Sequence, residues 1–406
     1  MSAGQSRPVA SASPYEGIGP EPKRAHWMVA GDGLVVLMEA VNIEVAAGHA
    51  QESQSGLQQL NPRIWGAFHR VPGPVAAIVI HPTSNFMAHY LLEPVARRGI
   101  AMLGLNTRYL GSDVSLLLER AIQDLGAGMR WLREQGYERI LLIGNSGGGA
   151  LVSLYQAQAE HLDITATPAG DPIALDPQDL PPAHGVLLSA AHRGRAHLMR
   201  NWIDPAVIDE DDAVSADPDI DMFNPANGPS YSAEFLTRYR AGQAARVERL
   251  EAWAFARLRQ LRALPDGPRD MAFVIHRTLA DPRCLDPTID PNDRAPGTTV
   301  WGAPRVQNQA ANSMGRFTTL TAFLSQWAPC SRGDGPACIA RTSVPIALAE
   351  HTADASTFPS DHEAWAAAAG GRLRRFRLDG GTHYLLGQPA LIDQLADEVA
   401  AFARAH

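Results

Sequence analysis

One serine lies between glycines at the point where an apolar stretch gives way to a helical pattern. The segment reads RILLIGNSGGGALVSLYQ over residues 139–156, with GNSGG at its centre. A chain that leaves a strand and enters a helix within two or three residues needs small residues on both sides of the turn. A serine at the apex points its hydroxyl out of the sheet, beside the N–H groups that begin the helix. This G-x-S-x-G pattern predicts a nucleophilic Ser146 on a strand–turn–helix elbow.

His383 is the histidine best placed to activate this serine. A serine hydroxyl is a poor nucleophile at neutral pH and needs a base, which an acid must hold in position. His383 follows two glycines in the segment LDGGTHYLLGQ and precedes a final amphipathic helical pattern. A loop at this place returns the imidazole over the edge of the sheet where Ser146 lies. We expect His383 to be the base; the alternative is an ordinary surface histidine.

Three carboxylates follow the last buried strand-like run before His383. The segment VPIALAEHTADASTFPSDHEAW, residues 344–365, contains Glu350, Asp354 and Asp361. Asp354 lies four residues beyond the end of the run, a typical reach for the loop that carries the acid. Glu350 is expected to be the last strand residue, and Asp361 to cap the following helix. Asp354 is therefore the preferred acid, and the other two carboxylates are alternatives.

The order of the apolar runs predicts the fold class. Near-continuous apolar runs suit strands buried on both faces of a parallel sheet, and helical patterns at residues 86–99 and 116–136 separate the early runs. Alternation of strands and helices predicts an α/β fold with a doubly wound, mostly parallel sheet. The predicted strands are residues 75–80, 100–105, 139–144, 184–190 and 344–350, with a more exposed edge strand at 372–380.

The pattern breaks for about 150 residues, which is too long for a normal connection. This stretch contains Asp/Pro-rich loops, a long amphipathic helix pattern at residues 232–264 and a strand-like segment, MAFVIHRTL, that the sequence does not place. We interpret residues 192–341 as a mainly helical inserted cap and residues 26–191 with 342–406 as the core. Residues 1–25, rich in Ser, Pro, Gly and Ala, are expected to form a disordered or extended tail.

The chain resembles the α/β-hydrolase superfamily at three places. They are GNSGG at the elbow, LAEHTADAST around the acid and GGTHY around the base. The resemblance covers about residues 71–191 and 342–406 and leaves out the cap. It implies an α/β-hydrolase fold in which Ser146, His383 and Asp354 form a catalytic triad.

The resemblance also implies an oxyanion hole. The His-Gly pair that the superfamily carries after the first of these strands appears here as HPTSN, residues 81–85. Carried over, the donors are the backbone N–H groups of Gly147 and Thr83, with Ser84 as an alternative. Pro82 has no N–H and cannot donate.

Candidates for the substrate pocket lie next to these residues and in the cap. They are His81, Asn145 and Trp202, and Met199 and Arg195 accompany Trp202 at the start of the cap. Trp202 could instead pack the cap onto the core. A large apolar lid predicts a bulky, hydrophobic small molecule as the substrate.

Composition excludes several other classes of protein. With 406 residues, 45% of them hydrophobic, and a net charge of −8, the chain has ample core and no basic surface for nucleic acid. No apolar run predicts a membrane span or a signal peptide, so we expect a cytoplasmic protein. Cys330 and Cys338 could close a small loop, although a reducing compartment favours free thiols. No residues have the spacing of a metal site or a Walker phosphate loop, and no cofactor is expected.

Carboxylic esters are the commonest substrates of this fold, which is an argument by association. We therefore expect water to cleave a small-molecule ester through an acyl-serine. Carbon–carbon bond hydrolysis, lactone or amide hydrolysis and acyl transfer by the same triad remain alternatives. A non-catalytic, hydrolase-like binding protein is an alternative of another class. The sequence leaves open whether the chain forms a homodimer.

Overall fold

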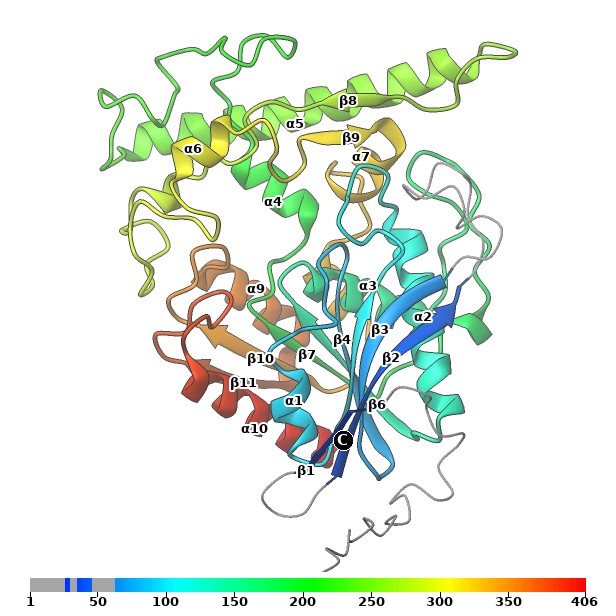
Figure 1. Cartoon of the computed structure of the whole chain (residues 1–406). Helices are drawn as coiled ribbons and strands as arrows, with labels where there is room; N and C mark the ends of the chain where they lie inside the picture. Colours follow the sequence, from blue (N-terminus) through cyan, green and yellow to red (C-terminus); the bar gives the residue numbers. More distant parts are fainter. Residues whose placement is uncertain (1–25, 30–34, 46–62) are drawn as a thin grey trace, which may run out of the picture.

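One large sheet organises the chain. The computed structural model describes residues 26–29, 35–45 and 63–406, so the predicted tail lies outside the described residues. Within these ranges nine strands form one sheet in the order β1-β2-β3-β5-β4-β6-β7-β10-β11 (Figure 1). The strands from β5 to β11 run parallel, and β1, β2 and β3 pair antiparallel. A doubly wound, mostly parallel sheet is thus confirmed.

The six parallel strands coincide with the six runs identified in the sequence. Burial on both faces explains their near-continuous apolar character, and every residue of β4 is buried. Three antiparallel strands at the start of the chain were not predicted. The bounds are β1 His26–Val29, β2 Val35–Glu44, β3 Arg63–Arg70, β4 Val75–His81, β5 Ala101–Asn106, β6 Arg139–Asn145, β7 Gly185–Ser189, β10 Ile346–His351 and β11 Leu373–Leu378.

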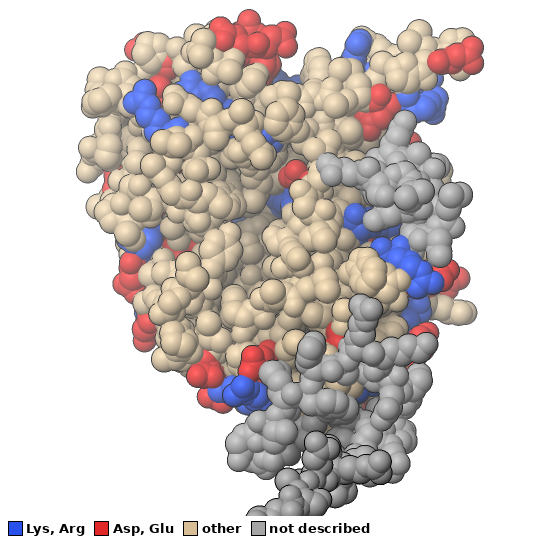
Figure 2. Space-filling model, viewed as in Figure 1, with Lys and Arg blue, Asp and Glu red and all other residues tan. Residues whose placement is uncertain are grey.

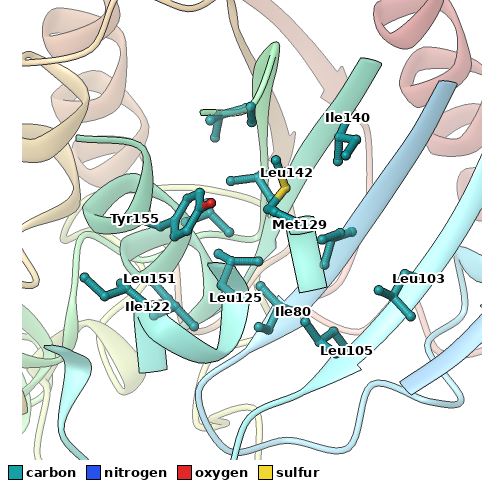
Figure 3. Close-up of a cluster of buried hydrophobic side chains, with 14 of the residues drawn as sticks. Ile80, Leu103, Leu105, Ile122, Leu125, Met129, Ile140, Leu142, Leu151 and Tyr155 are labelled. Atoms are coloured by element: carbon teal, nitrogen blue, oxygen red, sulfur yellow. The ribbon is translucent and has the colours of Figure 1, made fainter. Parts of the chain in front are cut away.

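Helices cover both faces of the sheet. Helices α1 (Leu92–Ala96) and α10 (Pro389–Ala405) pack on one face. Helices α2 (Leu118–Glu134), α3 (Gly148–Glu160) and α9 (Pro359–Ala369) pack on the other, together with the short α8 (Gly335–Ile339). Figure 3 shows how α2 and α3 side chains meet the strands in this second core: Ile122, Leu125, Met129, Leu151 and Tyr155 lie against Ile80, Leu103, Leu105, Ile140 and Leu142.

Two details of the predicted helices are informative. The pattern at residues 86–99 yields only the five residues of α1, because hydrogen-bonded turns occupy residues 86–92. Helix α2 ends as expected near Gly136, whose φ of +92° is a conformation that glycine adopts readily. Short 3-10 turns complete the core and the cap at Pro177–Asp179, Pro282–Cys284 and Gly370–Arg372.

Most of the segment between β7 and β10 forms a second layer above the sheet (Figure 1). Its longest element, α5 (Ala233–Arg262), begins where the Ser232 hydroxyl accepts a hydrogen bond from the Phe235 N–H. The unplaced segment MAFVIHRTL contains β8 (Ala272–Val274), which pairs with β9 (Phe317–Thr319). The other helices of this layer are α4 (Arg195–Trp202), α6 (Pro304–Gln309) and α7 (Leu320–Gln326), whereas α8, later in the same segment, packs against the core. This second layer, called the cap below, is mainly helical and contains one small two-stranded sheet. That residues 192–341 form an inserted cap stays a prediction.

Buried polar contacts join this cap to α2. The Ser325 hydroxyl of α7 donates to the Glu119 carboxylate at 2.7 Å and accepts the Leu118 N–H at 2.9 Å. The Gln326 amide donates to the Asp113 carbonyl at 2.7 Å. Glu119 and Ser325 are both fully buried, so the start of α2 and the cap share one interior.

Several general features of the described residues bear on the predictions. All three cysteines are free, so Cys330 and Cys338 form no disulfide. None of the helices in the described ranges is both long and apolar enough to span a membrane. On the face drawn in Figure 2, acidic and basic side chains are interspersed.

A buried ion pair fixes the loop that follows β5. Arg108 donates from Nε and Nη2 to Asp124 of α2, at 2.9 and 2.7 Å, and its backbone N–H donates to the same carboxylate at 2.8 Å. Both side chains are buried. Arg108 therefore has a structural position, and it does not line the cavity described below.

We expect Asp124→Ala to lower the free energy of unfolding by about 3–5 kcal/mol, because it removes the carboxylate from a buried guanidinium. Urea denaturation followed by circular dichroism measures the change. Glu93→Ala is the matched control, since Glu93 pairs with Arg97 on the surface and its loss should lower stability by less than about 1 kcal/mol. Equal effects of the two substitutions would contradict this account of the loop.

Candidate functional site

Ser146 lies at the tip of a tightly packed elbow between β6 and α3. Its φ of 54° is in the left-handed region, which a serine adopts only where the surroundings hold it there. The flanking glycines are required by space. A Cβ at Gly148 would lie 1.9 Å from the Ile80 carbonyl oxygen, and a Cβ at Gly144 would lie 2.6 Å from the Gly149 Cα. The sequence therefore places small residues where the start of α3 presses against the sheet.

His383 reaches this serine from the loop after β11. Its Nε2 lies 3.0 Å from the Ser146 Oγ, and its Nδ1 lies 2.8 Å from the Asp354 Oδ2. The loop itself is held by His351 at the end of β10. The His351 Nδ1 donates to the Thr382 carbonyl at 2.8 Å, and its Nε2 accepts from the Ser189 hydroxyl at 2.9 Å. The three residues named from the sequence thus form one hydrogen-bonded chain.

Asp354 is a fully buried, ionised carboxylate three residues beyond the end of β10. Besides His383 it accepts hydrogen bonds from the Ser356 N–H, the Thr357 N–H and the Thr357 hydroxyl, at 2.7, 3.1 and 2.6 Å. Burial by itself raises the pKa of this carboxyl. The neighbouring His383 and these hydrogen bonds outweigh burial and bring the pKa to about 2. Asp354 is therefore negatively charged at any neutral pH and faces the imidazole.

The two alternative acids lie elsewhere. Glu350 belongs to β10 and forms an ion pair with Arg375 of the neighbouring strand β11. Asp361 lies in the first turn of α9, where its Oδ2 accepts the Phe358 N–H at 3.1 Å. Neither carboxylate contacts His383.

The backbone donors differ from the expectation. The Gly147 N–H donates to no acceptor among the described residues. The N–H groups of Thr83 and Ser84, in contrast, both donate to the Nδ1 of His81, at 3.1 and 2.9 Å. The prediction that Thr83 or Ser84 offers a free backbone donor is therefore wrong for this structure, because a neighbouring imidazole already accepts both hydrogens.

A cavity of about 410 Å³ opens beside Ser146, between the core and the cap. His81 and Asn145 line it as expected, and Arg195 does so as well. Trp202 does not line it, because its side chain is buried in the hydrophobic cluster inside the cap with Met199. Trp202 packs edge-on against Trp301, and Trp301 is the tryptophan that borders the cavity.

Polar groups make up much of the cavity wall, and the expectation of a large apolar lining is not met. The apolar residues of α4, α5 and α7 pack against one another in the cap's own core, which leaves polar side chains to face the cavity. The Asp113–Arg195 ion pair, at 3.0 Å, lies in the wall. The other lining residues are Thr83, Ser84, Phe86, Gly111, Ser112, Gln307, Asn312, Ser313, Met314 and Tyr384.

Neutral, buried histidines surround the site. Burial lowers the pKa of His192 to about 3 and that of His362 to about 4. Burial also lowers the pKa of His351, and that of His81 falls well below its ordinary value. Desolvation is the first cause in each case, since an imidazolium loses its hydration in the interior. These four rings are therefore uncharged at neutral pH.

The similarities of this chain to known proteins are distant. No family model and no curated protein matches the chain. Among solved structures it is similar to the esterase domain of a Rhodothermus marinus protein (14% identity, 91% of this chain and 98% of that chain covered, TM-score 0.44). It is also similar to the Paleococcus ferrophilus monoacylglycerol lipase (13%, 84% and 99%, 0.44) and to DcsB in complex with its substrate analogue (12%, 94% and 99%, 0.47).

The buried histidines make stability depend on pH. In the unfolded chain a histidine takes up a proton below about pH 6.5, whereas these rings resist protonation in the folded state until much lower pH. The stability they give is thus complete above about pH 6.5 and is lost as the pH falls, by about 1.4 kcal/mol per pH unit for each proton.

We expect His362→Gln to reduce this slope by about one proton between pH 6 and pH 4.5, because glutamine does not titrate. Urea denaturation at several pH values measures the slope. The control is His161→Gln, at an exposed position that ends α3, which should leave the slope unchanged. Identical slopes in the wild type and His362→Gln would show that His362 is not a buried neutral group.

Proposed function

We propose that the protein is a serine hydrolase that cleaves a carboxylic ester of a small molecule through an acyl-serine intermediate. The observation that supports this best is the chain of contacts Ser146 Oγ, His383 Nε2, His383 Nδ1 and Asp354 Oδ2, at 3.0 and 2.8 Å. A nucleophile, a base and an orienting acid within hydrogen-bond reach are what acyl transfer to water requires.

In this mechanism the imidazole transfers one proton in each half of the reaction. His383 Nε2 takes the Ser146 proton as Oγ attacks the ester carbonyl carbon, and it gives that proton to the departing alcohol oxygen. Asp354 accepts the Nδ1–H throughout, so the ring keeps the tautomer whose Nε2 is free to accept. Water then repeats the sequence on the acyl-serine and releases the acid. The Gly147 N–H, unpaired in the described structure, faces the developing oxyanion.

The cavity supports a small substrate with polar groups near the ester. Its volume of about 410 Å³ lies in the lower part of the range of roughly 300–1,000 Å³ common for small-molecule sites. Gln307, Asn312 and the Asp113–Arg195 pair offer donors and acceptors, and Trp301 and Tyr384 offer aromatic faces. A long hydrocarbon would cover these groups without satisfying them, which is unfavourable. We therefore propose a short or hydroxylated ester in place of the bulky hydrophobic molecule expected from the sequence.

Ser146→Ala should lower kcat for p-nitrophenyl acetate at least about 10⁴-fold and abolish labelling by a fluorophosphonate probe, because the nucleophile is gone. Steady-state kinetics and mass spectrometry of the labelled peptide measure both effects. A wild-type protein that hydrolyses no ester and takes no label would instead support a non-catalytic binding protein.

Asp354→Asn should lower kcat by about 10³–10⁴-fold with the fold retained, since the neutral amide no longer stabilises the imidazolium. Asp361→Asn is the matched control, because Asp361 caps α9 and asparagine caps helices as well. Its kcat should stay within about threefold of the wild type. A larger loss of kcat in Asp361→Asn than in Asp354→Asn would show that Asp354 is not the acid that orients His383.

An acyl-length series tests the substrate. We expect kcat/KM for p-nitrophenyl acetate or butyrate to exceed that for the dodecanoate by at least about tenfold, because the cavity wall is polar and its volume small. All esters are measured below the critical micelle concentration of the dodecanoate, so that aggregation of that substrate does not affect its kcat/KM. A preference for the dodecanoate would favour the bulky hydrophobic substrate that the sequence suggested.

A further inference from the structure

The imidazole of His81 is held in one tautomer by the loop that follows it. The N–H groups of Thr83 and Ser84 both point to its Nδ1, at 3.1 and 2.9 Å. A ring nitrogen that accepts hydrogen bonds carries no proton, so the neutral ring must carry its single proton on Nε2. His81 therefore presents one N–H donor, and the loop fixes which nitrogen bears it.

This donor lies beside the elbow. β4 ends at His81 and pairs with β6, which ends just before Ser146, so the two strand ends are neighbours. A Cβ added at Gly147 would lie only 2.8 Å from the His81 Nε2. His81 and Ser146 line the same cavity, and the described residues supply no acceptor for the Nε2–H.

An oxyanion at this place otherwise has too few donors. Tetrahedral intermediates of acyl transfer are usually stabilised by two or more preorganised donors, and loss of one lowers kcat by about 10²–10³-fold. The Gly147 N–H is available, but the Thr83 and Ser84 N–H groups are already used by His81. Because Thr83 and Ser84 donate to the Nδ1 of His81, the donor that the loop leaves available is the Nε2–H on the other side of that ring.

We propose that the Nε2–H of His81 is the second donor of the oxyanion hole, together with the Gly147 N–H; this inference rests on the proposed serine-hydrolase function. As the Ser146 Oγ bonds to the carbonyl carbon, an electron pair moves onto the carbonyl oxygen, which accepts hydrogen bonds from both groups. The pair returns when the bond to the leaving oxygen breaks and His383 protonates that oxygen. His81 keeps its own proton throughout.

The surroundings of His81 favour this role. Burial, the nearby Arg195 guanidinium and the neighbouring imidazoles hold the pKa of His81 well below its ordinary value, so the ring donates as a neutral group. Arg195 also donates to the Thr83 hydroxyl at 3.2 Å, which steadies the loop whose N–H groups fix the tautomer. Both features keep the Nε2–H in place before substrate arrives, as electrostatic preorganisation requires.

Two substitutions separate the donor from a purely structural histidine. In His81→Asn, the Oδ1 can still accept from the N–H groups two and three residues on, as in an Asx turn, but no N–H reaches the position of Nε2. In His81→Gln, the longer amide brings an N–H toward that position and gives up the acceptor for the loop. A donor role predicts that Gln is the better replacement, and a loop-holding role predicts that Asn is.

We expect His81→Asn to lower kcat for p-nitrophenyl acetate by about 10²–10³-fold with KM changed less than about threefold and the urea midpoint retained. His81→Gln should keep at least about ten times the kcat of His81→Asn. The rate of fluorophosphonate labelling should fall in the same order, because its P=O oxygen occupies the oxyanion position. His161→Asn, on the surface, serves as the control and should match the wild type.

Three results would overturn the proposal. The first is a kcat of His81→Asn within threefold of the wild type, and the second is a kcat of His81→Gln no higher than that of His81→Asn. The third is a loss of kcat in His192→Gln but not in the His81 variants, since the His192 Nε2 is the other ring nitrogen near Gly147. A wild type that is active and Ser146-dependent while His81→Asn is unaffected refutes the role of His81 alone. An inactive, unlabelled wild type refutes the hydrolase function itself, so the two failures are distinguishable.

Discussion

Close backbone packing at the elbow is the constraint on which the site depends. Gly148 lies so near the Ile80 carbonyl, and Gly144 so near Gly149, that no larger residue fits at either position. This contact presses the start of α3 against β4 and β6 and holds Ser146 at a positive φ. The serine hydroxyl, the N–H after it and the end of β4 are thereby brought to one point, where the loops after β10 and β11 can deliver Asp354 and His383.

Electrostatics around Ser146 and His383 depend on one ionised carboxylate, Asp354, and several neutral histidines. Asp354 remains charged because three N–H or O–H donors and His383 surround it. The imidazoles of His81, His192 and His351 remain uncharged because each is buried. Among the described imidazoles, the His383 ring is hydrogen-bonded to Asp354, whereas the His81 and His351 rings bond to other groups. The carboxylate therefore stabilises positive charge most directly on His383. The distribution of charge thus separates a single base from several histidines of the same kind.

The sequence predicted the elements whose patterns are local. Buried runs revealed the parallel strands, and the order Ser146, Asp354, His383 indicated residues that the structure brings together. β2 and β3 were not predicted because exposed apolar and buried charged residues disturb their patterns. In β3, for example, Trp65 is 53% exposed while Arg70 is buried. β8 and β9, with three residues each, are too short for any period. Trp202 and Trp301 are equally aromatic, so only the path of the cap decides which one borders the cavity. The loss of the Thr83 and Ser84 donors likewise follows from a ring orientation that no sequence pattern encodes.

The shared interior of α2 and the cap has a mechanical consequence. To separate the cap from α2, the buried hydrogen bond between Ser325 and Glu119 would have to break. The hydrogen bond from Gln326 to the Asp113 carbonyl would have to break at the same time. These contacts therefore fix this side of the cap to the core, and this side does not act as a hinged lid. Asp113 and Arg195, which line the cavity, are held by the same contacts, because the Gln326 side chain accepts a hydrogen bond from Arg195 and donates one to the Asp113 carbonyl. We therefore expect the part of the cavity wall formed by Asp113 and Arg195 to keep its shape when a small molecule binds.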